Sequence, residues 1–495
     1  MGWKCFFATS PAVKAANGNQ KIGCERRKIM NEKVKTPLVR EGGAYDSLSA
    51  LYDEGTFVEL GAYVGKTAYA GVVCGYGAVN GALVFAFAQD LTRSGGAIGE
   101  DEAEKIVSLY DMAKKSGAPV IGIFEGAGAK VLEGTRALSA FGKIISKVSE
   151  ISGIVPQIAV IKGVCAGMSA VAASMFDLVI ASENASFFIN PPMVLKSKGG
   201  EKDAGSASSA ASNGNVDIVC ESGEQAISKA RELISLLPQN NAQGLAYGEA
   251  GDDNERLTPE LEGMTGVRDI IGTICDSQSF TEIKGHCAKE AICGFASLGT
   301  ISTGVVAIDE NSYLTPAAAR KIASFVSFCD NYMIPVLTLV STKGIDPSVD
   351  AENAAYAPEL ARLASAYASS TNAKVTLVCG KAYGAAFTLL GSKAVGADVA
   401  YALPCAEISV MAPDAAVQFV YGEEIKNAED SVAKRKELTE KWIAENACAE
   451  AAASKGDIDD VVSYELARAK VISAFMMLWA KADGKVLKKH TKLPF

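Results

Sequence analysis

The chain has 495 residues, of which 49% are hydrophobic and 21% charged, and it carries a net charge of −9 at pH 7. This composition is typical of a soluble globular protein with two or three domains and excludes a disordered chain. The negative charge and the lack of basic runs with aromatic residues argue against a nucleic-acid partner. No apolar run approaches the roughly 20 residues that span a bilayer, so we expect a cytoplasmic protein that is not membrane-spanning.

The twelve cysteines lie scattered through apolar stretches, and no two are spaced as C-x-x-C. A zinc ribbon or a thioredoxin-type site is therefore not expected, and neither is a bound metal. Free thiols buried in a reducing cytoplasm explain these cysteines.

Residues 1–29 are basic and slightly apolar but contain no long apolar core, and Met30 opens a sequence typical of a natural start. We expect 1–29 to be a disordered extension. After it, apolar runs at 79–87, 120–124 and 158–161 predict strands, and the patterns at 100–116, 134–151 and 166–174 predict helices. Strands that alternate with helices indicate an α/β fold.

The second part of the chain repeats the first. The matched stretches are 51–60 with 274–283, 74–76 with 293–295, 105–128 with 321–344, 158–163 with 375–380, and 177–181 with 398–402. The order is preserved and the offset is about 220 throughout, which indicates duplication of a whole domain. We place the halves at 30–250 and 251–495.

Other segments are expected to connect or extend these halves. The Ser-, Gly- and Ala-rich stretch 196–214 predicts a mobile loop, and 238–266 predicts a polar linker after a helix at 224–236. Helical patterns at 431–446 and 461–478 predict a helical tail at the end of the second half.

Histidine is almost absent, and this narrows the chemistry. The only two, His286 and His490, stand near no plausible nucleophile, so a Ser-His-Asp or Cys-His mechanism is not expected. The chain also lacks a Walker A motif and a strand-placed GxGxxG motif, which argues against nucleotide hydrolysis.

Turns of small residues follow a buried strand twice in each half. They lie at 125–130 and 163–168 in the first half, and at 341–344 and 380–386 in the second. Such turns leave main-chain N–H groups without helical partners, and two of these groups can bind one oxygen. One such turn alone is more often structural. Four of them in equivalent places predict two oxyanion holes.

The chain resembles the carboxyltransferase subunits of biotin-dependent acyl-CoA carboxylases and decarboxylases, a family that includes propionyl-CoA carboxylase, methylmalonyl-CoA decarboxylase and transcarboxylase. The stretches that match are 87–92, 95–100, 116–121, 153–157, 236–241, 349–352, 381–386, 392–398, 406–411, 456–461 and 489–494. The resemblance runs from Met30 to the end of the chain. It implies two tandem crotonase-like (ClpP/crotonase) domains.

The resemblance also implies which groups act. The N–H groups of Gly128 and Ala129 and of Gly167 and Met168 would hold the enolate oxygen of a CoA thioester on the first half. The ureido oxygen of carboxybiotin would lie near Gly344, Ile345, Ala385 and Ala386 on the second half. Lys130, Gly95, Gly96, Tyr383, Gly384 and Thr388 are further candidate binding residues.

The chain departs from the family pattern at several of these positions. The family has arginine where Lys130 stands and a second glycine where Met168 and Ala385 stand. Pro347-Ser348 replaces the usual Pro-Gly, and Thr388 falls where many relatives carry an acidic residue in the acyl pocket. These departures leave open which acyl-CoA is used.

The chain has no Met-Lys-Met biotinylation site. The expected partners are therefore a biotin carboxyl carrier protein and either a biotin carboxylase or a membrane decarboxylase subunit, with the chain itself forming a homo-oligomer, a dimer or a trimer of dimers. The expected reaction moves a carboxyl group between carboxybiotin and a short-chain acyl-CoA. Two alternatives remain: a crotonase-type hydratase or isomerase, for which Glu133 is a weak candidate base, and a non-catalytic scaffold.

Overall fold

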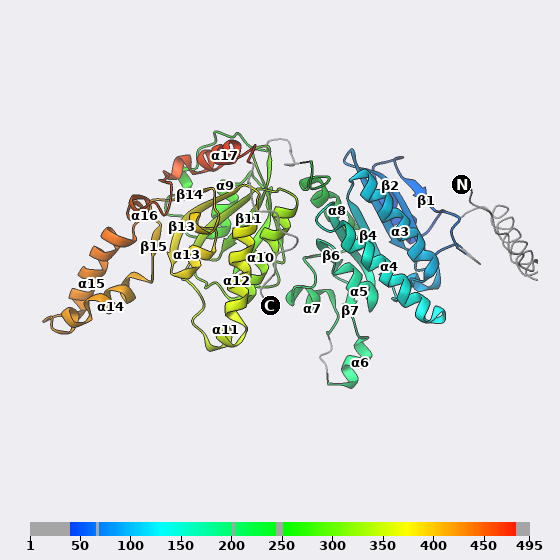
Figure 1. The fold of residues 1–495 in the computed structure, drawn as a ribbon, viewed down its shortest axis with the longest axis horizontal. Coiled ribbons are helices and arrows are strands. Elements are labelled where there is room, and N and C mark those ends of the chain that lie inside the picture. Colours follow the sequence, from blue (N-terminus) through cyan, green and yellow to red (C-terminus); the bar gives the residue numbers. More distant parts are fainter. Residues whose placement is uncertain (1–39, 66–68, 200–202, 244–250, 482–495) are drawn as a thin grey trace, which may run out of the picture.

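A computed structural model describes residues 40–65, 69–199, 203–243 and 251–481. The expected extension at 1–29 lies outside these ranges, and 244–250 lies outside them at the predicted boundary between the halves, so both remain predictions. Figure 1 shows two α/β halves side by side. None of the helices in the described ranges is long and apolar enough to cross a membrane.

The first half contains an eight-stranded sheet in the order β1-β2-β3-β4-β5-β6-β8, with β7 paired to β5. Its strands are β1 (Val58–Leu60), β2 (Val72–Val79), β3 (Ala82–Gln89), β4 (Val120–Gly126), β5 (Gln157–Ala166), β6 (Leu178–Ser182), β7 (Ser186–Phe188) and β8 (Ile218–Cys220). Its helices are α2 (Gly43–Leu51), α3 (Glu100–Ser116), α4 (Thr135–Ile151), α5 (Met168–Ala173), α6 (Pro192–Ser197), α7 (Ala207–Ser212) and α8 (Gly223–Leu236). The strands run antiparallel from β1 to β3 and parallel from there on.

The second half repeats this order as β9-β10-β11-β12-β13-β14-β16, with β15 paired to β13. Its strands are β9 (Thr281–Ile283), β10 (Ala291–Leu298), β11 (Ile301–Ile308), β12 (Val336–Thr342), β13 (Lys374–Tyr383), β14 (Val399–Ala402), β15 (Glu407–Ser409) and β16 (Asp460–Val461). Its helices are α9 (Val267–Ile274), α10 (Pro316–Asn331), α11 (Val349–Asn353), α12 (Tyr356–Ser369), α13 (Ala385–Leu389), α14 (Pro413–Lys426), α15 (Ser431–Trp442), α16 (Ala449–Lys455) and α17 (Ala467–Met477). The expectation of a duplicated α/β fold is confirmed.

The register of the sheets shows how close the duplication is. Glu59 pairs with Gly75 between β1 and β2, and Glu282 pairs with Gly294 between β9 and β10. Both glycines are required by packing, because an added Cβ would lie 2.4 Å from Val58 O at Gly75 and 2.3 Å from Thr281 O at Gly294. The close approach of β1 to β2 in the first half is therefore repeated by β9 and β10 in the second half.

Three local expectations need correction. The strand predicted at 79–87 is β3, but it begins at Ala82, because Asn80 and Gly81 adopt positive φ and turn the chain after β2 ends at Val79. The loop predicted at 196–214 contains α7, whose first turn is capped by the Ser206 side chain. The helix predicted at 461–478 is shorter, since β16 precedes it and α17 begins at Ala467.

The two halves share a hydrophobic core along α10. A single cluster of buried side chains includes Ile158 and Leu178 of the first half and Phe325 of the second. At the end of this junction the Tyr332 hydroxyl oxygen lies 2.9 Å from Val155 O and 2.8 Å from the Asp177 carboxylate, within hydrogen-bond distance of both. Helix α10 therefore fixes one sheet against the other.

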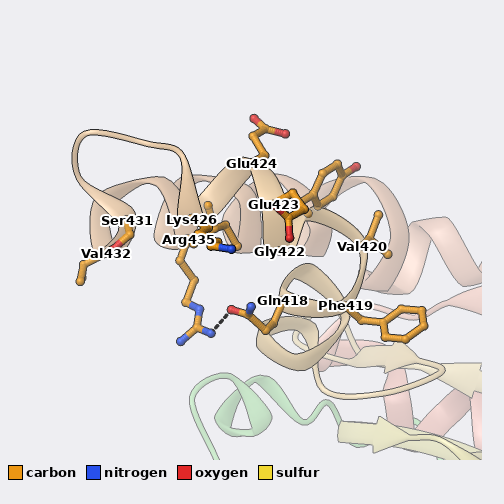
Figure 2. A pocket seen from close by; sticks show the side chains of 12 residues that line it. Gln418, Phe419, Val420, Gly422, Glu423, Glu424, Lys426, Ser431, Val432 and Arg435 are labelled. Atoms are coloured by element: carbon orange, nitrogen blue, oxygen red, sulfur yellow. Dashed lines mark hydrogen bonds between the residues drawn. The ribbon is translucent and has the colours of Figure 1, made fainter.

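The second half carries a projecting hairpin formed by α14 and α15 (Figure 1). Val417, Ile425 and Leu438 form its small core. A space of about 800 Å³ lies along this hairpin, where Arg435 donates a hydrogen bond to Gln418 (Figure 2). The residues that line it come from the hairpin alone, so it has no part in the predicted turns.

Candidate active site

Each predicted turn sits where two neighbouring parallel strands end together. Between β4 and β5, Gly126 pairs with Cys165, and between β12 and β13, Thr342 pairs with Ala382. Three residues beyond these pairs lie Ala129 and Met168 in the first half, and Ile345 and Ala385 in the second. Since adjacent strands are about 4.8 Å apart, the members of each pair are held close together.

The turns of each half are in direct contact. A Cβ added at Gly128 would lie 3.0 Å from Ala166 O, and one added at Gly344 would lie 3.4 Å from Tyr383 O. Gly128 and Gly344 have φ of 93° and 117°, and Gly167 and Gly384 have φ of 58° and 62°. A glycine with positive φ therefore stands directly before each of the four turn residues. These four residues are Ala129, Met168, Ile345 and Ala385.

The orientation of Ala129 follows from a short parallel bridge. Ile98 N donates to Gly128 O at 2.8 Å, and Lys130 N donates to Ile98 O at 2.9 Å. Because both neighbours bond to Ile98, the N–H of Ala129 faces the opposite side. Among the described residues it has no hydrogen-bond acceptor.

Ile345 repeats this arrangement in the second half. Leu314 N donates to Gly344 O at 2.9 Å, and Asp346 N donates to Leu314 O at 3.3 Å. Met168 and Ala385 are the first residues of α5 and α13, where an N–H has no intrahelical partner. The part of the chain that the structure describes offers no acceptor to any of these N–H groups, so each half presents a pair of free amides.

Two of the predicted amides are not free. Gly167 N donates to Phe188 O at 2.8 Å, and Gly344 N donates to the Thr342 hydroxyl at 3.3 Å. They are unavailable because β7 closes over the turn after β5 and because the Thr342 side chain caps the turn after β12. These two glycines shape their turns, and the binding capacity lies in the following residue. Ala386 is fully buried behind Ala385.

Gly96 packs against the protein and offers no room for a ligand. It is buried, and an added Cβ would lie 2.2 Å from Glu125 O. The Gln89 side chain also donates to Gly96 O at 2.8 Å. Its neighbour Gly95 has no heavy atom within 4 Å of an added Cβ and accepts a hydrogen bond from Ala127 N at 3.1 Å. Both glycines therefore support the turn that bears Ala129.

Lys130 is held by a buried carboxylate. Its ammonium lies 2.7 Å from Glu102, whose side chain is fully buried and also accepts from Gly71 N and Gly99 N. Burial raises the pKa of Glu102, but Lys130 and these amides more than offset it and hold the pKa below its usual value. Lys130 also borders a cavity of about 500 Å³ that Arg93 and Arg136 share.

Glu133, the candidate base of a hydratase, is engaged as well. Its carboxylate accepts from Glu100 N at 2.8 Å, at the start of α3. A carboxylate at this position stabilises the positive end of a helix. This structural role removes the one observation that favoured a hydratase.

Ala385, one member of the second amide pair, lines a cavity of about 570 Å³, and Ile345 is not among its lining residues. Its walls include Gly384, Ala385 and Thr388, which the sequence predicted, and Trp442, Asn446 and Lys455, which it did not. Tyr383 points elsewhere: its hydroxyl bonds to the Glu407 carboxylate, and burial together with that carboxylate raises the pKa of the phenol. The Tyr383 phenol therefore stays protonated, and its hydrogen bond to Glu407 holds β15 against β13.

Comparison with known proteins gives matches over most of the chain. Residues 42–493 match the family model described as carboxyl transferase domain. The chain is 37% identical over 441 residues to the propionyl-CoA carboxylase carboxyltransferase subunit of Haloferax mediterranei, covering 86% of each protein. It is 35% identical over 479 residues to methylmalonyl-CoA decarboxylase subunit alpha of Propionigenium modestum, covering 91% of this chain and 93% of that one.

A solved structure shows the same architecture throughout. Transcarboxylase 12S, crystallised as a hexamer with methylmalonyl-coenzyme A and methylmalonic acid bound, superposes with a TM-score of 0.86 at 31% identity. The match covers 98% of this chain and all of that chain. The expected crotonase-like halves are thus confirmed. The chain belongs to the carboxyl transferase domain family of biotin-dependent acyl-CoA carboxyltransferases.

Proposed function

We propose that this chain transfers a carboxyl group between carboxybiotin and the α-carbon of a short-chain acyl-CoA of the propionyl or methylmalonyl type. The observation that supports this most is the pair of free main-chain amides in each half. Ala129 and Met168 suit the thioester oxygen, and Ile345 and Ala385 suit the ureido oxygen of biotin. The names of the relatives support the substrate class.

The chemistry follows from where negative charge develops. Loss of the carboxyl group from carboxybiotin as CO₂ leaves its electron pair on the ureido group, and the amides of Ile345 and Ala385 stabilise the resulting oxygen anion. That anion takes the α-proton of the thioester, whose enolate oxygen is stabilised by Ala129 and Met168. The enolate carbon then bonds to CO₂. Because biotin accepts the proton, the chain needs no basic side chain.

We further propose that the chain works as a homo-oligomer with a separate biotin carrier. Large apolar side chains are exposed in both halves, among them Leu132 (104%), Met193 (76%), Val410 (83%) and Phe419 (84%). Apolar groups of this size favour burial against a second protein surface. A site formed by the first half of one subunit and the second half of its partner would bury them. A biotin carboxylase or a membrane decarboxylase subunit would complete the system.

The test uses the purified full-length chain with free biotin and either malonyl-CoA or methylmalonyl-CoA. Loss of CO₂ that depends on biotin is the expected result. Hydration of crotonyl-CoA without biotin would instead establish a hydratase. A protein that binds CoA esters but is inert in both assays would be a scaffold, and the proposed transfer would be wrong.

A further inference from the structure

The turn after β4 and the turn after β12 are each tied to an earlier segment of the chain by three main-chain hydrogen bonds. In the first half these bonds join the turn to 95–98 and measure 3.1, 2.8 and 2.9 Å. In the second half they join the turn to 312–314 and measure 3.1, 2.9 and 3.3 Å. The longest runs from Asp346 N to Leu314 O, directly after Ile345. Because N–H···O bonds in proteins usually measure about 2.7–3.2 Å, this bond is weak by itself.

The hydroxyl of Tyr356 joins both ends of this weak bond. It accepts a hydrogen bond from Asp346 N at 2.7 Å and donates one to Leu314 O. The side chain is buried, and burial raises the pKa of the Tyr356 phenol above its usual value. The hydroxyl therefore keeps its proton at neutral pH and can donate and accept at once. It closes the bridge that the main chain leaves too wide.

The first half has a different kind of residue at the matching place. Tyr356 is the first residue of α12 and follows Ala355, whose φ is 55°. The matching helix α4 begins at Thr135, which is exposed and follows Gly134 with a φ of 56°. An alanine is strained at positive φ, where glycine is not. The second half thus keeps the bend despite its strain, and the bend leads into a buried tyrosine.

The turn of the second half has a flexible point that makes such a hold useful. Gly344, with a φ of 117°, stands directly before Ile345. The direction of the Ile345 N–H is that of the peptide unit whose oxygen, Gly344 O, accepts from Leu314 N at 2.9 Å. Glycine alone would let this peptide unit rotate. The Tyr356 hydroxyl holds the same bridge one residue beyond Ile345, so the peptide unit is fixed from both sides.

We propose that Tyr356 is a positioning residue that keeps the Ile345 N–H directed at an oxygen anion. It acts through the main chain and not by contact with a substrate. Donors that are already oriented stabilise developing charge without the cost of reorganisation. Loss of the hydroxyl should therefore act on the chemical step and not on binding of the CoA ester. This inference rests on the proposed function, because it takes Ile345 as an amide that stabilises the ureido oxygen.

Kinetics with Tyr356→Phe tests the role of the hydroxyl, since phenylalanine keeps the buried ring. With full-length protein, free biotin and methylmalonyl-CoA, we expect kcat to fall about tenfold, part of the roughly 100-fold or more that loss of a whole oxyanion donor costs. The KM for the CoA ester should stay unchanged.

The matched control is Tyr367→Phe on the same helix. The buried Tyr367 hydroxyl shares a hydrogen bond with Thr338 in β12 at 2.8 Å and takes no part in the turn. Both variants lose one buried hydrogen bond, so their thermal midpoints should fall by similar amounts. Only Tyr356→Phe should lose activity. Wild-type kcat in Tyr356→Phe, or equal losses of kcat in the two variants, would overturn the inference.

Hydrogen exchange gives a second readout that needs no turnover. The Asp346 N–H should exchange faster in Tyr356→Phe, because its shorter bond is lost, and at the wild-type rate in Tyr367→Phe. Mass spectrometry of a peptide that spans 343–348 measures this difference. An unchanged rate in Tyr356→Phe would also overturn the inference. If wild type shows no biotin-dependent reaction, the proposed function fails, and exchange still decides whether the hydroxyl holds the turn.

Discussion

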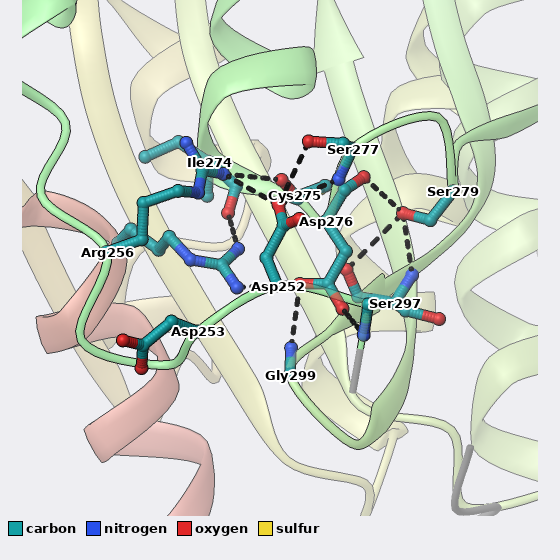
Figure 3. Close-up of polar contacts among 12 residues, drawn as sticks. Asp252, Asp253, Arg256, Ile274, Cys275, Asp276, Ser277, Ser279, Ser297 and Gly299 are labelled. Carbon is teal, nitrogen blue, oxygen red and sulfur yellow. Dashed lines mark hydrogen bonds and ion pairs between the residues drawn. The ribbon is translucent and has the colours of Figure 1, made fainter. Parts of the chain in front are cut away.

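Arg468 and Asp276 form a fully buried ion pair that repeats the pairing of Arg231 with Asp53 in the first half. Arg468 donates to Asp276 and to Ile274 O, both at 2.6 Å, and Arg231 donates to Asp53 at 2.8 Å and to Leu51 O. The side chains of the first pair are 0% and 1% exposed, and those of the second are 24% and 30% exposed. Figure 3 shows how Asp276 also accepts from Gly299 N.

Loss of the buried arginine should destabilise the protein far more than loss of its half-exposed counterpart. Arg468→Met leaves the Asp276 carboxylate without its cation in the interior, which costs about 3–5 kcal/mol of unfolding free energy. Arg231→Met leaves a carboxylate that water can reach, so the loss should be much smaller. Unfolding in urea measures both variants. Equal losses would show that burial does not set the strength of this pair.

The junction between the halves should weaken as pH rises. Burial raises the pKa of Asp177 from 3.8 to about 6, although Tyr332 and the amide of Gln157 donate to it. Because the folded pKa lies above the unfolded value, the stability from protonated Asp177 is fully present below about pH 4 and is lost as pH rises through about 6.

Asp177→Asn tests this dependence because its side chain carries no charge at any pH. Between pH 4 and pH 7 the wild type should lose about 1–3 kcal/mol relative to the variant, the smaller values applying because part of the residue reaches the surface. Urea unfolding at a series of pH values measures the difference. A constant difference across this range would contradict the prediction.

The left-handed glycine before Ala129 should be essential for activity. In Gly128→Ala the new Cβ meets Ala166 O at 3.0 Å at a φ of 93°, so the turn must shift and displace the Ala129 amide. We expect kcat for carboxyl transfer to fall about 100-fold or more. Gly142→Ala in α4 is the control, since its Cβ meets no atom within 4 Å. It should keep full activity and gain up to about 1 kcal/mol in stability.

The pair of Lys130 and Glu102 should contribute to stability at neutral pH. The lowered pKa of Glu102 means that this stability is present above its unfolded pKa of 4.5 and is lost as pH falls. Lys130→Met should cost about 1–3 kcal/mol, less than a fully buried pair because two amides still bind Glu102. Lys147→Met, which removes two surface ion pairs, with Asp111 and with Glu150, should change little. Thermal unfolding at pH 7 compares the two variants.

Much of this architecture could be predicted because it depends on short stretches of sequence. The buried strands β4 and β12 begin with short, mostly apolar stretches, and the glycines of their turns follow soon after. The arginine–aspartate pairs could not be predicted, since Arg231 and Arg468 bond to residues 178 and 192 positions away. Helix α7 was missed because Ser and Gly suggest a loop, although Ser206 caps it.

The candidate site, too, could be predicted only where it depends on short stretches of sequence. Equivalent glycines in both halves located the amide turns, but composition does not reveal which N–H is already used. Gly167 donates to a strand 21 residues later in the chain, at Phe188. Trp442 was missed for another reason: the segment that carries it occurs once, so the internal repeat, which was the strongest guide, gave no signal there.

The repeated arginine has a consequence for how the chain folds during synthesis. The first half obtains Arg231 from α8, its own last helix, and can close before the second half is made. The second half must wait for α17, its last described helix, because that helix carries Arg468. Ribosomes that stop before this point would release a chain whose Asp276 has no cation, and such truncated products should be selectively degraded.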